Sequence, residues 1–471
     1  MCVALAGQEF SNLCKRNLHV STTTLDAGLR PEDEKLPVAT AFLYGFQHIL
    51  SMYGGVIAIP LIIGTAAKLP PAEVGMLVAS ALFVSGLATL LQSLGLPGLG
   101  SKLPLVNGTT FGAVSTMLAI IASGGGLPVI YGSVIVAGVI GFLLAPLFSR
   151  IQRFFPPVVT GTIITAMGIS LLPVAAGWIT NQDPGGASLT NLLLAGFTLA
   201  VVLVCTRIRQ LARVAILVGI VVGTVVAALF SQADFSQVGQ GSVFAFPRPF
   251  HFGAPRFELG AIISMTIVIV VTLMEIMADL FAVAKVVGTR VDEKRIANGL
   301  RADMLATILA PLFNSFPPTA FAQNVGLVAV TKVKSRYTVA AGAVLLLLLG
   351  MFPLLGRVVA CVPSAVLGGA GVVLFGSVAA AGVQTLQQAD FERGNNIFVV
   401  ATSLALVMFP IAVPAFYAQL PTWLGMILGS GISAAALSAV VLNLLLNGRH
   451  ATRGALGDEM EAVPAPEPFE G

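Results

Sequence analysis

Two acidic residues inside apolar sequence are the first candidates for chemistry. Glu275 lies in the middle of the apolar run at residues 271–279, and a charged carboxylate in a membrane is costly unless it is protonated, paired or faces a polar cavity. Asp279 follows four residues later, so both side chains share one face of a helix. Two acids on one face repel each other, which makes the pair a natural proton carrier. The alternative is a structural pair bonded to the backbone at a helix break.

Asp303 and His48 are the other ionisable candidates in apolar sequence. Asp303 lies near the start of its run beside Arg301, and it could hold neighbouring segments together or act directly. His48 follows Gln47, and a lone histidine is more often a packing residue than a ligand. A structural role beside a site and direct contact with a proton or substrate both stay open. The spacing of histidines and cysteines predicts no metal site and no cofactor.

An amide pair and two phenylalanines indicate a site for a flat polar ring. Gln323 and Asn324 lie together in an apolar segment, and a side-chain amide offers one acceptor and two donors. This pattern matches the alternating N–H and C=O edge of a nucleobase, although an interhelical clamp is the alternative. Phe111 and Phe321 occupy matching positions in two Pro-containing segments and could flank a ring, or they could simply pack.

The elements that carry these residues are those of a polytopic membrane protein. Of the 471 residues, 56% are hydrophobic and 10% are charged, with a mean hydropathy of +0.94. A soluble domain carries about 25% charged residues, so a soluble enzyme is excluded. The apolar runs are continuous, as at residues 339–352, whereas a membrane β-barrel alternates apolar and polar positions. We therefore expect an all-α protein that crosses a lipid bilayer.

Apolar runs separated by polar, Pro or Gly residues predict about 14 membrane spans. They lie near residues 37–62, 72–93, 105–122, 128–148, 158–178, 189–206, 213–231, 258–284, 297–313, 318–331, 337–357, 363–382, 396–414 and 420–446.

The charges predict how these spans are oriented. Most of the 25 lysines and arginines fall on the side of the N-terminus, as the positive-inside rule requires. The exceptions are Lys68, Arg248, Arg256 and Arg357. We expect cytoplasmic tails at residues 1–36 and 447–471, the latter disordered, and an extracytoplasmic loop at 232–257. The basic residues then set topology in a bacterial-type inner membrane and do not indicate binding of nucleic acid.

Seven spans on each side of the loop predict an inverted repeat of residues 37–231 and 258–446. The third span of each half is interrupted by Pro and polar residues, at 104–113 and 317–326. Paired broken segments indicate a substrate site near the membrane midplane. Two ordinary Pro-kinked helices are the alternative.

Residues 323–332 resemble the signature of the nucleobase–ascorbate transporters, the nucleobase:cation symporter family 2. That signature is Gln/Glu/Pro-Asn-x-Gly-x4-Thr-Arg/Lys/Gly, and all five defined positions match. Residues 47–48, 275–279 and 299–303 look like three further motifs of the family. Met304 departs from the glycine that is common there, which affects the packing expected at Asp303.

The resemblance, which spans about residues 37–446, implies a fold and an assembly. It implies fourteen spans in a 7+7 inverted repeat, with short strands in broken segments 3 and 10. A core domain would contain residues 37–148 and 258–357, and a gate domain residues 158–231 and 363–446. Members look like homodimers that move the core against the gate in an elevator-like cycle.

The resemblance also implies roles for the residues that match its motifs. Glu275 and Gln323 would bind the base by their side chains. The residues that would stack or offer backbone contacts are Phe111, Phe321 and Ala322. The residues that would organise the site or couple protons are Gln47, His48, Asp279, Asp303 and Asn324. The hydroxyl of Thr110 could suit the extra carbonyl of urate, and it does not exclude xanthine.

The expected function is proton-coupled uptake of an oxidised purine, urate or xanthine or both. Gln at the first signature position resembles the xanthine and urate carriers, whereas Glu resembles the uracil carriers and Pro the ascorbate carriers. Sodium coupling through Asp279 and freed backbone carbonyls is a second option. The rival functions are uptake of uracil or another nucleobase, anion transport of the sulfate/bicarbonate class, and intramembrane catalysis, for which no catalytic constellation is visible.

Overall fold

The computed structural model describes residues 30–448 except 149–153, 182, 184, 209–210, 234, 236–237, 239–243, 393–394 and 414. Of the predicted tails at 1–36 and 447–471, residues 30–36 and 447–448 are described, and the rest lies outside the described residues. The side chains of Arg213, Gln323, Leu355, Thr422 and Met426 are also outside them.

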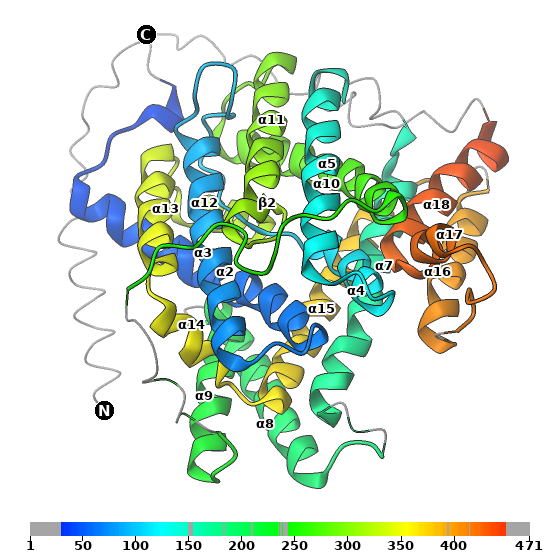
Figure 1. Cartoon of the computed structure of the whole chain (residues 1–471). Coiled ribbons are helices and arrows are strands. Elements are labelled where there is room, and N and C mark those ends of the chain that lie inside the picture. The colour runs from blue at the N-terminus through cyan, green and yellow to red at the C-terminus, as the bar shows by residue number, and fades with distance from the viewer. Residues whose placement is uncertain are drawn as a thin grey trace.

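Long apolar helices make up most of the described chain (Figure 1). Within it, eight helical stretches are long and apolar enough to cross a membrane, and a bent pair raises the number to nine. The eight contain α2 (Val38–Ala66), α3 (Pro71–Ser93), α5 (Gly126–Leu144), α7 (Pro157–Thr180), α8 (Leu189–Arg207), α10 (Leu259–Val287), α11 (Glu293–Leu309) and α15 (Ser364–Leu386). The bent pair is α17 (Thr422–Gly429) and α18 (Gly431–Asn447). The polytopic all-helical class predicted from the apolar runs is confirmed.

Shorter helices lie between the long ones. They are α4 (Val114–Ala122), α9 (Ala215–Leu229), α12 (Ala322–Thr331), α13 (Arg336–Gly350), α14 (Pro353–Ala360) and α16 (Asn396–Ala412).

Two predicted spans that were expected to be unbroken are not continuous helices. The span expected at 337–357 ends at Gly350, and α14 starts at Pro353. Proline has no backbone N–H and disfavours helical geometry in the residue before it, which agrees with the non-helical backbone of Phe352. The span expected at 420–446 bends by 87° at Ser430, between α17 and α18.

Two short strands interrupt the helical architecture where the broken segments were expected. β1 (Asn107–Thr109) pairs antiparallel with β2 (Pro318–Ala320), with Gly108 opposite Thr319. Both strands are buried, and each provides hydrogen-bond partners for the other. Such pairing is what permits extended backbone away from water. One strand comes from each half of the chain, and each precedes a short helix, α4 or α12.

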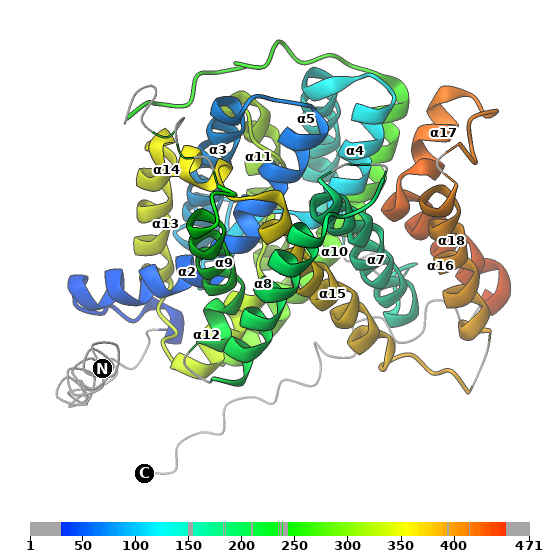
Figure 2. The ribbon, with the colours of Figure 1, turned by 90° about the horizontal axis from the view of Figure 1, so that it is seen from below.

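The helices form a central group with smaller groups on either side. Figures 1 and 2 both place α3, α13 and α14 on one side and α16, α17 and α18 on the other. Small residues allow close approach, as expected between membrane helices. A Cβ added at Gly168 of α7 would lie 2.2 Å from the backbone nitrogen of Ala379 in α15. The loop at residues 244–258 crosses one end of the molecule, and α12 lies toward the other end (Figure 2).

Candidate functional site

The strand pair brings the starts of two short helices together. Thr110 follows β1, and its backbone N–H donates to the carbonyl of Pro317 at 2.9 Å. Phe321 follows β2, and its N–H donates to the carbonyl of Val106 at 3.0 Å. Thr110 also caps the next turn, because its Oγ1 accepts from the N–H of Gly112 at 3.0 Å. Helix N-termini carry partial positive charge, so this arrangement favours electronegative ligand atoms.

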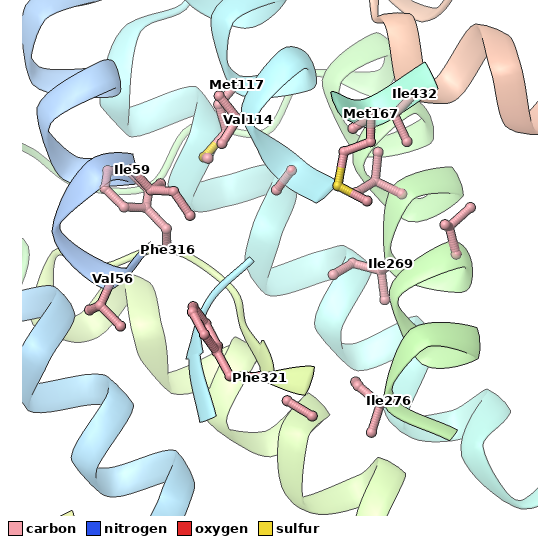
Figure 3. Close-up of a cluster of buried hydrophobic side chains, with 14 of the residues drawn as sticks. Val56, Ile59, Val114, Met117, Met167, Ile269, Ile276, Phe316, Phe321 and Ile432 are labelled. Carbon is pink, nitrogen blue, oxygen red and sulfur yellow. The ribbon is translucent and has the colours of Figure 1, made fainter. Parts of the chain in front are cut away.

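The two predicted aromatic residues lie against the same point of α2. A Cβ added at Gly55 would be 2.7 Å from Cε1 of Phe321 and 3.8 Å from Cε2 of Phe111. Phe321 is buried, whereas Phe111 is half-buried and meets Phe375 of α15 edge-on at 6.0 Å. Phe321 lies in the interior of the molecule beneath Val114 and Ile59 (Figure 3). The sequence pattern placed both rings in one region, and the structure does so too.

Three carboxyl groups gather beside the strands. Glu275 and Asp279 lie on α10 and are half-buried, whereas Asp303 on α11 is fully buried. Asp279 lies close enough to Glu275 and Asp303 for a charge on either to repel a charge on it. The expected pairing of Glu275 with Asp279 thus includes a third acid. Three acids in one region can exchange protons with one another or with a ligand.

Asp303 connects α11 to the first broken segment. Its Oδ1 accepts hydrogen bonds from Nδ2 of Asn107 in β1 and, at 3.3 Å, from Nε2 of Gln92 in α3. Gln92 also accepts from the N–H of Ser101 at 2.9 Å. Sequence reasoning missed Asn107 and Gln92, although a polar amide within apolar sequence was a usable signal. Met304, the departure from the motif, packs against α5, where a Cβ on Gly141 would be 2.5 Å from its sulfur.

His48 and Asn324 are buried with unused hydrogen-bonding groups. His48 is 2% exposed, and its Nδ1 has no partner among the described residues. Asn324 is fully buried, and neither atom of its amide finds a partner in the described part of the chain. Buried polar groups are normally hydrogen-bonded, so both are available to a ligand, a proton or water.

Three predicted residues remain, Gln47, Ala322 and Gln323. Gln47 is half-buried beside His48 on α2, and Ala322 is exposed in the first turn of α12. Gln323 follows Ala322 in that turn, but its side chain lies outside the described part of the structure.

A cavity of about 320 Å³ adjoins this region and is lined by α2, α9, α12, α15 and the residues before α9. Phe321 lies in its wall, whereas Phe111 and the three acids are not among its lining residues. The cavity is only partly enclosed, and Val330 in its lining is 53% exposed. Its polar side chains are Ser51 and Ser377.

Comparison with known proteins identifies close sequence relatives. A family model described as "Permease family" matches residues 39–416. A uric acid permease of Bacillus subtilis, PucJ, is 39% identical over 415 residues, covering 86% of this chain and 92% of the relative. A xanthine permease of the same organism is 40% identical over 409 residues, covering 86% and 93%. The uric acid transporter UacT of Escherichia coli is 39% identical over 430 residues, covering 89% of each chain.

Solved structures share the fold at low sequence identity. The transmembrane domain of the cyanobacterial bicarbonate transporter BicA has a TM-score of 0.57 at 14% identity, covering 86% of this chain and 99% of that one. The murine anion transporter Slc26a9 in the inward-facing state has a TM-score of 0.58 at 14% identity, covering 91% and 73%.

Proposed function

Because this chain belongs to the permease family of the xanthine and uric acid permeases, we propose that it takes up urate, xanthine or both by proton symport. The chain is a multi-pass membrane transporter and, at the level of its family, not an enzyme. The observation that carries the purine assignment is identity of 39–40% to uric acid and xanthine permeases over most of both chains.

The site contains groups that suit an oxidised purine. Phe111 and Phe321 lie close together and supply flat apolar faces, while the two helix N-termini attract the carbonyl oxygens of the ring. Glu275 accepts a purine N–H as a carboxylate, and Gln323 reads the alternating donors and acceptors of the ring edge. The hydroxyl of Thr110 can donate to a further carbonyl.

Proton coupling follows from the change in hydrogen bonding when an acid is protonated. A neutral Glu275 can donate a hydrogen bond, whereas its carboxylate can only accept. Binding of a purine N–H therefore depends on the protonation state of Glu275, and negative charges on Glu275 and the nearby Asp279 repel each other. The remaining predicted residues, Gln47, His48, Ala322 and Asn324, would organise the site or relay the proton.

The proposed transport cycle is elevator-like alternating access. Fourteen spans would form a core domain (37–148 and 258–357) and a gate domain (158–231 and 363–446), with both termini cytoplasmic. The cavity supports this division, because it is lined both by α2 and α12 of the proposed core and by α9 and α15 of the proposed gate. With that topology the cavity opens to the cytoplasm, which corresponds to an inward-facing state. A homodimer is proposed from the family resemblance.

Uptake of radiolabelled urate and xanthine, with and without a protonophore, tests the proposal. We expect purine accumulation that collapses with the protonophore. In Gln323→Glu, this accumulation should be lost or its substrate preference changed. The matched control is Gln387→Glu, an exposed glutamine after α15, which should transport as the unmodified chain does. No uptake of either purine by a well-folded protein would refute the substrate assignment. Uptake of uracil or of bicarbonate would then identify one of the two rival transport functions.

A further inference from the structure

Four buried hydroxyl groups from three parts of the chain meet away from the acids. Oγ1 of Thr116 in α4 lies 2.6 Å from Oγ of Ser430, and Oγ of Ser264 in α10 lies 3.0 Å from Oγ of Ser433. Weaker contacts at 3.4 and 3.5 Å join Thr116 to Ser433 and to Ser264. All four residues are fully buried. Hydroxyls in membrane helices commonly bond to their own helix, so a cluster that joins three segments is unusual.

The cluster joins the two units proposed to move against each other. Thr116 and Ser264 belong to the proposed core, whereas Ser430 and Ser433 lie at the bend between α17 and α18 in the proposed gate. The bend packs closely against α7 of the proposed gate. A Cβ added at Gly431 would lie only 2.8 Å from the Cβ of Ser170 in α7. The hydroxyls therefore bond across the boundary between core and gate.

The cluster lies at the opposite end of this boundary from the cavity. Ser264 precedes Glu275 by eleven residues, or about 16 Å along α10. Figure 3 places Ile432, which lies between two of the serines, level with Val114 of α4 and above Phe321. In Figure 2, α4 and α17 lie toward the end crossed by the loop at 244–258, whereas α12 lies at the other end. Among the described residues, the boundary between the proposed core and gate thus contains the cavity at one end and the hydroxyl cluster at the other.

We propose that Thr116, Ser264, Ser430 and Ser433 form a hydroxyl latch that closes the extracytoplasmic end of the substrate pathway and must separate for the site to open there. This proposal rests on the alternating access proposed above. Neutral hydroxyls suit the role because each bond has a modest net strength and is replaced by a bond to water when the halves part. Loss of one bond shifts the equilibrium between closed and open states about two- to tenfold.

Cysteine labelling tests the latch without a substrate. The full-length chain, with its four cysteines replaced by serine, carries Ile432→Cys, which is fully buried while the latch is closed. A membrane-impermeant maleimide is applied from the extracytoplasmic side of right-side-out vesicles. We expect Thr116→Val or Ser433→Ala to raise the labelling rate about two- to tenfold.

Matched controls are buried hydroxyls that bond within their own helix. Thr162 donates to the carbonyl of Val158, and Ser85 donates to that of Ala81 at 2.6 Å. Thr162→Val and Ser85→Ala should leave the labelling rate unchanged. Equal labelling rates in latch and control variants would overturn the proposal, whether or not the chain transports a purine.

A cross-link gives a second, independent measurement. The paired substitutions Thr116→Cys and Ser430→Cys place two thiols where the hydroxyl oxygens are 2.6 Å apart. Oxidation should form a disulfide that stops uptake, and a reductant should restore it. Undiminished uptake by the cross-linked protein would show that the latch does not separate during transport.

Discussion

The turn that precedes α2 is connected to the candidate site by a continuous set of hydrogen bonds. Glu32 is fully buried and accepts from Nη2 of Arg295, at the start of α11, at 2.6 Å. Arg295 also donates from Nε to the carbonyl of Ser101. Ser101 in turn donates to Gln92, which donates to Asp303. Neutralising Glu32 should therefore weaken both the fold and the site.

The size of this effect follows from the burial of the ion pair. Removing one partner of a buried pair costs about 3–5 kcal/mol. For Glu32→Gln we expect about 3 kcal/mol, the low end, because the carbonyls of Ser101, Arg290 and Lys102 still accept from Arg295. At about 2.1 cal/mol/K per residue, 471 residues have an unfolding entropy of about 1 kcal/mol/K. Helices that persist in detergent make this entropy smaller, so the melting temperature should fall by at least about 3 °C.

The assay is thermal unfolding of the purified protein in detergent, together with purine uptake at matched expression. Glu34→Gln is the matched control, because Glu34 is two residues away and exposed. We expect Glu34→Gln to match the unmodified chain in both measurements. If Glu32→Gln and Glu34→Gln have the same melting temperature and uptake, the buried pair does not support α11, and the connection to Asp303 is wrong.

Two further changes have defined outcomes. Glu275→Gln should abolish accumulation of purine against a gradient while leaving exchange of labelled for unlabelled substrate, and protonophore-sensitive accumulation by this variant would contradict proton coupling through Glu275. Gly168→Ala should destabilise the chain by about 1–3 kcal/mol, because the methyl group would collide with the α15 backbone. Gly196→Ala, at a helical glycine with open space around it, should be neutral or slightly stabilising, and equal melting temperatures for the two variants would refute the packing argument.

The apolar helices could be predicted from the sequence because the bilayer requires long apolar runs. The broken segments could be predicted because Pro and polar residues interrupted two of those runs at matching places. Local signals were also sufficient to predict that Glu275 and Asp279 lie close together, since a spacing of four residues places both on one helix face. The break before Pro353 was missed because the surrounding residues are as apolar as a true span.

Contacts between distant residues left no such signal. Asn107 bonds to Asp303, 196 residues later, and Thr116 bonds to Ser430, 314 residues later. A serine or threonine in an apolar helix satisfies its hydroxyl equally well on its own backbone, so the residue type does not reveal a partner. Only the packing of the two halves against each other decides which of these groups meet.

The same packing explains why a strand pair stands at the centre of a helical membrane protein. Breaking a helix at β1 or β2 frees backbone groups that cost several kcal/mol each if they stay unpaired away from water. Each half supplies one strand, so neither half can satisfy its own broken segment, and antiparallel pairing requires both halves to be in place. The break that places two helix N-termini together is therefore stable only in the complete fold. Substitutions that separate β1 from β2 should impair folding and purine uptake together.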